Sequence, residues 1–160
     1  MPAIRLVVSE EMAPARAWAP YGLMPSTVML RAQFPVTEED LEPKAAPSGD
    51  DTPEIVLDRY LGHHPYEDYD SYLATLHSSS GDTGGLIVKM IDLVQRIGPK
   101  SRCAAWVNHI GAPYEVAAHL QGTALPRFAG VFGRGTTFCL IFEDAGPVLT
   151  DEELDEPSVW

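Results

Sequence analysis

The segment LIVKMIDLVQRI (86–97) is the most hydrophobic stretch of the chain and constrains its fold most strongly. Placed on a helix, its apolar side chains cover a wide face, whereas Lys89, Asp92 and Arg96 share a narrow polar side. The Gly-Pro pair at 98–99 is typical of a helix end. We therefore expect a helix over 86–97 that lies across a sheet.

Further helices are predicted on both sides of this segment. Thr52 and Pro53 have the character of an N-cap and a first helical residue, which predicts a helix over 53–61. A second amphipathic helix is predicted to begin at Pro65, because five apolar or aromatic residues after it share one arc of about 120°. These residues are Tyr66, Tyr69, Tyr72, Leu73 and Leu76. The stretch 123–132 is predicted to be helical as well.

The strands are predicted from short runs of β-branched and apolar residues. They cover 3–8, 27–34, 102–109, 114–120 and 136–143, and the third and fourth form a hairpin. Strands and helices are thus grouped rather than strictly alternating. We predict an α+β fold, a two-layer sandwich with a mainly antiparallel or mixed sheet of about five strands, helices on one face, and a partly ferredoxin-like arrangement.

The chain has no internal repeat or domain break, so we expect one domain over 1–143 and an acidic C-terminal tail over 144–160. Thr37 and Asp40 have capping-box-like spacing, and residues 42–51 are expected to form a polar loop. The first residues lack a basic start followed by a long hydrophobic region, and no apolar stretch reaches about 18 residues. These features favour a soluble cytoplasmic protein.

The net charge of −12 is concentrated in two segments. Residues 36–70 hold eleven acidic and two basic residues, and residues 143–160 hold seven acidic residues and no basic one. Such a field repels nucleic acid and anionic membranes and attracts a basic protein. The alternative is that these acids only solvate loops and a tail.

The partner-binding residues are predicted in the acidic segment, which includes the tyrosine-rich stretch HHPYEDYDSY (63–72). Tyrosines are enriched at interface hot spots, and carboxylates steer a basic partner. Tyr69, Leu73 and Leu76 are expected in the core, and the two tyrosines at the edges of the arc are expected to face outward. The candidate partner-binding residues are Glu38, Glu39, Asp40, Tyr66, Glu67, Asp68, Asp70 and Tyr72.

No catalytic, metal or cofactor site is predicted. Cys103 and Cys139 lie in apolar runs and are expected to be buried thiols. His64 and Asp68 are the only helical i, i+4 pair among the candidate metal ligands of that region, which is too little for a metal site. The Gly/Ser segment 78–85 before a predicted helix is weakly similar to phosphate-binding loops. With nearby histidines, it supports an alternative function as a small-ligand enzyme or sensor.

In size, acidity and predicted class the chain resembles the immunity proteins that neutralise bacterial polymorphic or contact-dependent toxins. Its use of Ala, Pro, Arg and Gly would suit a GC-rich bacterium. The resemblance implies a non-catalytic inhibitor that blocks the active site of a basic toxin domain. A phage-encoded inhibitor of a host defence protein has the same physical profile.

Overall fold

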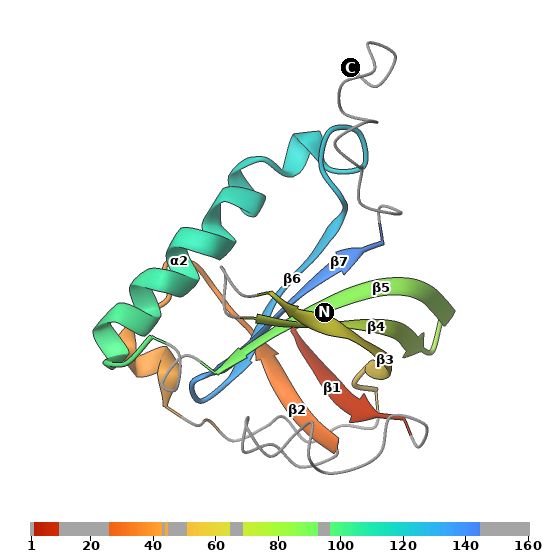
Figure 1. Cartoon of the computed structure of the whole chain (residues 1–160), viewed down its shortest axis with the longest axis horizontal. Helices are drawn as coiled ribbons and strands as arrows, with labels where there is room; N and C mark the ends of the chain where they lie inside the picture. The colour runs from red at the N-terminus through yellow and green to blue at the C-terminus, as the bar shows by residue number, and fades with distance from the viewer. Residues whose placement is uncertain are drawn as a thin grey trace.

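The computed structural model describes residues 2–9, 26–42, 44, 51–64, 69–92 and 97–144, with the backbone alone described for His64. Seven strands form a closed barrel, and a long helix packs on its outside (Figure 1). The strands are β1 Ala3–Val8, β2 Ser26–Arg31, β3 Glu54–His64, β4 Tyr69–Ser78, β5 Gly81–Asp92, β6 Phe128–Arg134 and β7 Thr137–Glu143. The helices are the 3₁₀ turn η3 Glu38–Leu41, the α-helix α2 Lys100–Val116 and the 3₁₀ turn η4 Ala118–Leu120.

The order of strands around the barrel is β1-β2-β6-β7-β5-β4-β3, and β3 pairs with β1 to close it. The β1–β3 pair is parallel and the other six pairs are antiparallel. Closure leaves each of the seven strands with a neighbour on both sides, which satisfies most backbone groups. The chain leaves the barrel after β5, forms α2, and returns through η4 to β6 (Figure 1).

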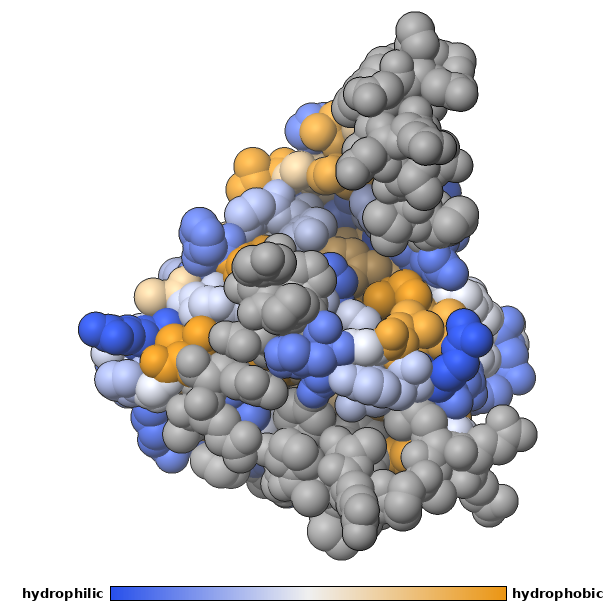
Figure 2. All heavy atoms as spheres, viewed as in Figure 1, coloured by the Kyte–Doolittle hydropathy of each residue, from blue (hydrophilic) through white to orange (hydrophobic). Residues whose placement is uncertain are grey.

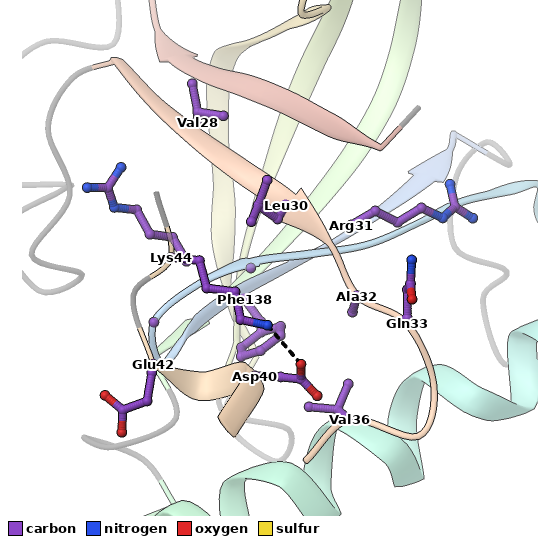
Figure 3. Close-up of a pocket in the computed structure, with 13 residues that line it drawn as sticks. Val28, Leu30, Arg31, Ala32, Gln33, Val36, Asp40, Glu42, Lys44 and Phe138 are labelled. Atoms are coloured by element: carbon purple, nitrogen blue, oxygen red, sulfur yellow. Dashed lines mark hydrogen bonds and ion pairs between the residues drawn. The ribbon is translucent and has the colours of Figure 1, made fainter. Parts of the chain in front are cut away.

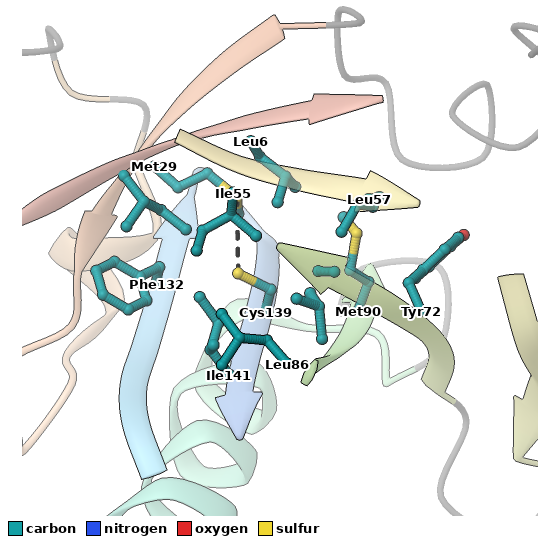
Figure 4. Close-up of a cluster of buried hydrophobic side chains, with 13 residues drawn as sticks. Leu6, Met29, Ile55, Leu57, Tyr72, Leu86, Met90, Phe132, Cys139 and Ile141 are labelled. Atoms are coloured by element: carbon teal, nitrogen blue, oxygen red, sulfur yellow. Dashed lines mark hydrogen bonds between the residues drawn. The ribbon is translucent and has the colours of Figure 1, made fainter. Parts of the chain in front are cut away.

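The barrel interior is filled by one cluster of hydrophobic side chains. They come from all seven strands and include Met29, Ile55, Tyr72, Phe132 and Cys139, each exposed by 2% or less. Figure 4 shows the side chains of Met29 and Cys139 directed toward each other, with Cys139 Sγ 3.9 Å from Met29 Sδ. The interior is therefore a packed core, as expected of a small barrel.

A second hydrophobic cluster lies between α2 and the outer surface of the barrel. Cys103, Ala104 and Val107 of α2 are buried against outward-facing side chains of β5, β6 and β7. The helix packs closely at Gly111, where an added Cβ would lie 2.3 Å from Phe34 Cζ of the connection after β2 and 3.0 Å from Val131 Cγ2 of β6. Strand β7 is consequently buried on both faces over Thr137–Phe142, with Cys139 and Ile141 directed inward and Phe138, Leu140 and Phe142 directed toward α2.

The predicted α+β two-layer sandwich of about five strands is wrong, because the described residues form a closed seven-stranded barrel with one long helix. In the residues that the structure describes, the helices predicted over 53–61, from Pro65 onward and over 86–97 are the strands β3, β4 and β5. Five of the seven residues 86–92 are apolar because β5 is covered by the core on one face and by the second cluster on the other. Such a strand has no alternation that distinguishes it from a buried helix.

The predicted hairpin over 102–120 is wrong as well, since these residues form α2 and η4. The predicted helix over 123–132 overlaps β6 instead. The strands predicted over 3–8, 27–34 and 136–143 are confirmed as β1, β2 and β7, with β2 ending at Arg31. The capping box at Thr37 and the two buried thiols are confirmed.

Within the described ranges, neither the length nor the apolar character of any helix suffices to cross a membrane. Figure 2 shows that hydrophobic side chains reach the surface around the C-terminal end of α2 and η4. There Val116 is 81% exposed and Leu120 is 39% exposed. The predicted acidic tail lies outside the described residues beyond Asp144.

Candidate protein-binding surface

A cavity of about 270 Å³ opens on the outer surface of the barrel, between β2, η3 and the β6–β7 hairpin (Figure 3). Its apolar part is formed by Val28, Leu30 and Phe138, together with Val36 from the connection to η3. Side chains alternate across a strand, so the burial of Met29 in the barrel directs Val28 and Leu30 outward. The cavity therefore has an apolar floor made by the barrel wall.

The cavity lies where the pairing of β2 with β6 ends. Only Leu30 and Arg31 of β2 pair with β6, opposite Gly133 and Phe132. Beyond this point β6 turns into β7 through Gly135, whose φ of 59° favours glycine. The short pairing leaves the outward face of β2 beside the hairpin turn, and the two together make the cavity.

The acidic turn η3 forms another wall of this cavity. Asp40 Oδ2 accepts hydrogen bonds from the Thr37 backbone N–H at 2.8 Å and from Thr37 Oγ1 at 3.0 Å. The Thr37 N–H, aided by Lys44, lowers the pKa of Asp40 below its usual value. Asp40 is thus ionised at neutral pH and lines the cavity with a fixed negative charge.

Two ion pairs join the charged side chains near the cavity. Lys44 Nζ lies 3.0 Å from Asp40 Oδ1 (Figure 3), and Lys100 of α2 pairs with Glu42. All four side chains are at least 39% exposed. These pairs contribute little to stability, since exposed pairs are worth about 0–1 kcal/mol.

The cavity lining holds three basic side chains, Arg31, Lys44 and Arg134, and two acidic ones, Asp40 and Glu42, so the excess of negative charge here comes from η3 beside the cavity. The charges differ in their availability. Arg31 donates from Nη1 to the Ala129 carbonyl oxygen at 2.8 Å and stacks at 5.9 Å from the ring centre of Phe132. Glu38 and Glu39 are exposed, and neither makes a side-chain hydrogen bond or ion pair with the described part of the chain. Two carboxylates next to the cavity are therefore accessible to a partner.

Asp70, another predicted binding residue, lies on β4 and is held by β3. Tyr60 Oη donates to Asp70 Oδ1 at 3.1 Å, and His63 Nδ1 lies 3.0 Å from the same oxygen. The neighbouring Tyr60 and Leu61 are 50% and 44% exposed. This end of the β3–β4 hairpin presents an aromatic and an aliphatic side chain to solvent, beside a carboxylate that is already engaged.

Tyr72 is only 2% exposed and lies inside the barrel. The prediction that it faces outward is therefore wrong. The ring centre of Tyr72 lies 5.3 Å from that of Tyr60, which occupies the outer end of this pair. Tyr69, expected in the core, is half-buried on the outer surface of the wall. Tyr66, Glu67 and Asp68 lie outside the described residues.

The structure thus brings Glu38, Glu39 and Asp40 together on η3, whereas Asp70 belongs to a different element. Sequence reasoning missed the apolar floor of the cavity. Side chains of a strand point alternately to its two faces, so a buried Met29 would have indicated that Val28 and Leu30 face outward. The position of Phe138 beside them depends on barrel closure and has no local signal.

The two thiols and the Gly/Ser segment, considered above as reactive or ligand-binding groups, have defined places in the structure. Burial raises the pKa of the Cys139 thiol to about 12 and also raises that of Cys103, so both are poor nucleophiles at neutral pH. The Gly/Ser segment is a turn and the start of β5 rather than a loop before a helix, and His77 there pairs with Asp82 at 3.0 Å. In the described ranges no three His, Cys, Asp or Glu side chains are grouped to hold a metal ion.

Comparison of this chain with models of protein families, with curated proteins and with solved structures gave no match.

Proposed function

We propose that this protein binds a basic partner protein at the cavity beside η3, without catalysis of its own. The observation that carries the proposal is an apolar floor, formed by Val28 and Leu30, beside the acidic turn η3, which forms one part of a rim that also holds Arg31 and Arg134. An arginine or lysine side chain has matching character, because its aliphatic stem packs on apolar surface while its charge remains at the edge.

The negative charge of the rim extends beyond Asp40. Glu38 and Glu39 precede it on the same turn and are exposed. Lys44 now pairs with Asp40, but this exposed pair is weak enough for a partner's arginine to replace it. An arginine would also gain a two-pronged hydrogen bond to a carboxylate, which a lysine cannot form.

The partner class follows from charge. A chain of net charge −12 attracts basic proteins over long range, and the accessible carboxylates of η3 would then set their orientation. An inhibitor of immunity type, which blocks the active site of a basic toxin domain, fits this profile and forms the specific part of the proposal. The two free, buried thiols suit a reducing compartment, so we propose that the protein acts in the cytoplasm.

The small-ligand alternative at 78–85 loses its structural basis. It depended on glycines that present backbone N–H groups at the start of a helix. The segment instead continues as β5, in which Gly81, Asp82 and Thr83 pair with β4 and no helix begins. No ligand is assigned to this segment.

The test measures binding of a short labelled peptide of alternating arginine and leucine by fluorescence anisotropy. The double variant Glu38→Gln/Glu39→Gln should weaken binding by about 1–2 kcal/mol, or roughly 5- to 30-fold in Kd. It should also flatten the salt dependence of the association rate, because fewer charges steer the encounter.

The matched control is Glu54→Gln/Glu115→Gln, which makes the same change in net charge at two exposed carboxylates on β3 and α2. This control should change Kd by less than about twofold. Equal weakening by both double variants would mean that the peptide responds only to net charge. This result would contradict binding at the cavity beside η3. Failure of the wild type to bind the peptide at low salt would overturn the proposal of a basic partner.

A further inference from the structure

The first part of β2 is paired on one side only. Its residues 26–30 pair with β1, whereas only Leu30 and Arg31 pair with β6 on the other side. Strand β6 ends at Arg134 and turns back into β7, so it does not extend along the rest of β2. Within the described residues, positions 26–29 of β2 therefore form an open sheet edge.

The backbone groups of Val28 face this open edge. In a strand, the N–H and C=O groups of successive residues point alternately to its two sides. The Arg31 N–H donates to the Pro2 carbonyl oxygen at 2.9 Å, so odd-numbered residues of β2 face β1. The Ala32 N–H donates to the Val131 carbonyl oxygen of β6 at 2.8 Å, so even-numbered residues face the other side.

The pairing with β1 leads to the same assignment. Arg5 lies opposite Val28, but its N–H donates away from β2, to the Pro53 carbonyl oxygen at 2.8 Å. Arg5 and Val28 are therefore a pair without mutual hydrogen bonds. In the part of the chain that the structure describes, the N–H and C=O groups of Val28 and Ser26 make no hydrogen bond, so they can bind an added strand.

The open edge borders the cavity beside η3. Val28 and Gly135 of the hairpin turn both line that cavity, and Figure 3 shows Val28 on β2 and Asp40 on η3 at two of its walls. Residues that are directly opposite in an antiparallel pair direct their side chains to the same face. A residue added opposite Val28 would therefore direct its side chain over the apolar floor and toward the acidic turn.

We infer that the basic partner binds through an extended segment that adds to the open edge of β2 as an antiparallel strand, with an arginine opposite Val28. This inference rests on the proposed function and specifies how the partner is held. The antiparallel direction continues that of β6, which is antiparallel to β2 on the same side. Backbone hydrogen bonds to Ser26 and Val28 supply affinity, and the alternate side chains over the cavity supply specificity.

Hydrogen exchange of single backbone N–H groups, followed in ¹H–¹⁵N spectra of the full chain, tests the edge directly. In the free protein the Val28 N–H should exchange at least about tenfold faster than the Met29 N–H, which faces β1. Saturation with the peptide of alternating arginine and leucine should slow exchange at Val28 at least about tenfold and leave Met29 unchanged. A Val28 N–H that is protected in the free protein, or unprotected in the complex, would overturn the inference.

Two N-methylated forms of this peptide test the direction of its backbone groups. Methyl groups on the arginine amides block the side that faces β2, whereas the same number on the leucine amides block the opposite side. The form methylated at arginine should bind at least about tenfold more weakly in fluorescence anisotropy, and the form methylated at leucine should stay within about threefold. Equal affinities or the reverse order would contradict the added strand.

Val28→Pro and Val28→Ala form a matched pair of variants, since both lose the isopropyl group and only the proline loses the N–H. Val28→Pro should bind the peptide at least about tenfold more weakly than Val28→Ala. Melting curves identify a variant that fails to fold, and the methylated peptides with the wild-type chain then decide. Binding that depends on neither the Val28 N–H nor the arginine amides would overturn this inference and leave the basic partner in place. Failure of the wild type to bind the peptide at low salt would instead overturn the proposed function, and this inference with it.

Discussion

Asn108 of α2 is hydrogen-bonded to both backbone groups of Val36. The Val36 N–H donates to Asn108 Oδ1 at 2.7 Å, and Asn108 Nδ2 donates to the Val36 carbonyl oxygen at 2.9 Å. Val36 is followed directly by the Thr37 cap of η3 and lines the cavity beside that turn. This side chain therefore fixes the acidic turn relative to the helix and the barrel.

Replacing Asn108 by Leu should destabilise the fold by about 2–4 kcal/mol, because two hydrogen bonds are lost and two partly buried backbone groups are left without their partner. Urea unfolding provides the measurement. Asn108→Asp keeps the acceptor and loses the donor, and should therefore fall between the wild type and Asn108→Leu. A cost of less than about 0.5 kcal/mol for Asn108→Leu would show that this contact does not hold the turn.

Two adjacent residues of β4 should contribute differently to the stability of the fold. Tyr72 is buried in the interior, whereas Leu73 is half-buried on the outer surface. Tyr72→Ala should cost about 3–5 kcal/mol and Leu73→Ala about 1 kcal/mol. The reverse order, which a helical arrangement with Leu73 in the core would produce, is the outcome that contradicts this placement. Thermal or urea unfolding of both variants decides.

Burial of Cys139 has a consequence at high pH. Its pKa is about 12 in the folded protein, compared with the ordinary value of 9.0 for the exposed thiol of an unfolded chain. Between these values the unfolded chain loses a proton that the folded protein keeps, so stability is full below pH 9 and falls as the pH rises. The thiol should contribute a loss of up to about 1.4 kcal/mol per pH unit in that range.

Cys139→Ala tests this effect, since the variant lacks the group that titrates. Urea unfolding from pH 8 to pH 10.5 should show a shallower loss of stability in Cys139→Ala than in the wild type, with lysines and tyrosines common to both. Parallel slopes would contradict the burial of an un-ionised thiol. Native protein at pH 8 should correspondingly react slowly with thiol reagents at both cysteines, and denatured protein rapidly.

The local sequence determined the features that depend on neighbouring residues. The runs 3–8 and 136–143 are short, β-branched and apolar, and they are strands. The Thr37–Asp40 spacing produced the capping box, because the donor and the acceptor are three residues apart and need no tertiary partner. The candidate carboxylates of η3 were predictable for the same reason.

Tertiary structure decided between helix and strand wherever a segment is buried on more than one side. Residues 86–92 are covered by the barrel core and by the second cluster, so apolar residues stand on both faces of the strand, and this pattern fits both a helix and a strand. In β4, Leu73 is an apolar residue on the half-buried outer face and stands between Tyr72 and Ala74, which obscures the alternation of these two buried residues. The sequence of this segment therefore fits an amphipathic helix as well as it fits a strand.

The candidate site depends still more on long-range structure. Barrel closure places Val28 beside Phe138, and the end of β6 at Arg134 leaves part of β2 unpaired on one side. Composition alone indicated an acidic chain suited to a basic partner, because charge is a property of the residues themselves. The shape that a partner meets arises only when distant strands pair, since no local pattern encodes which outward-facing side chains become neighbours.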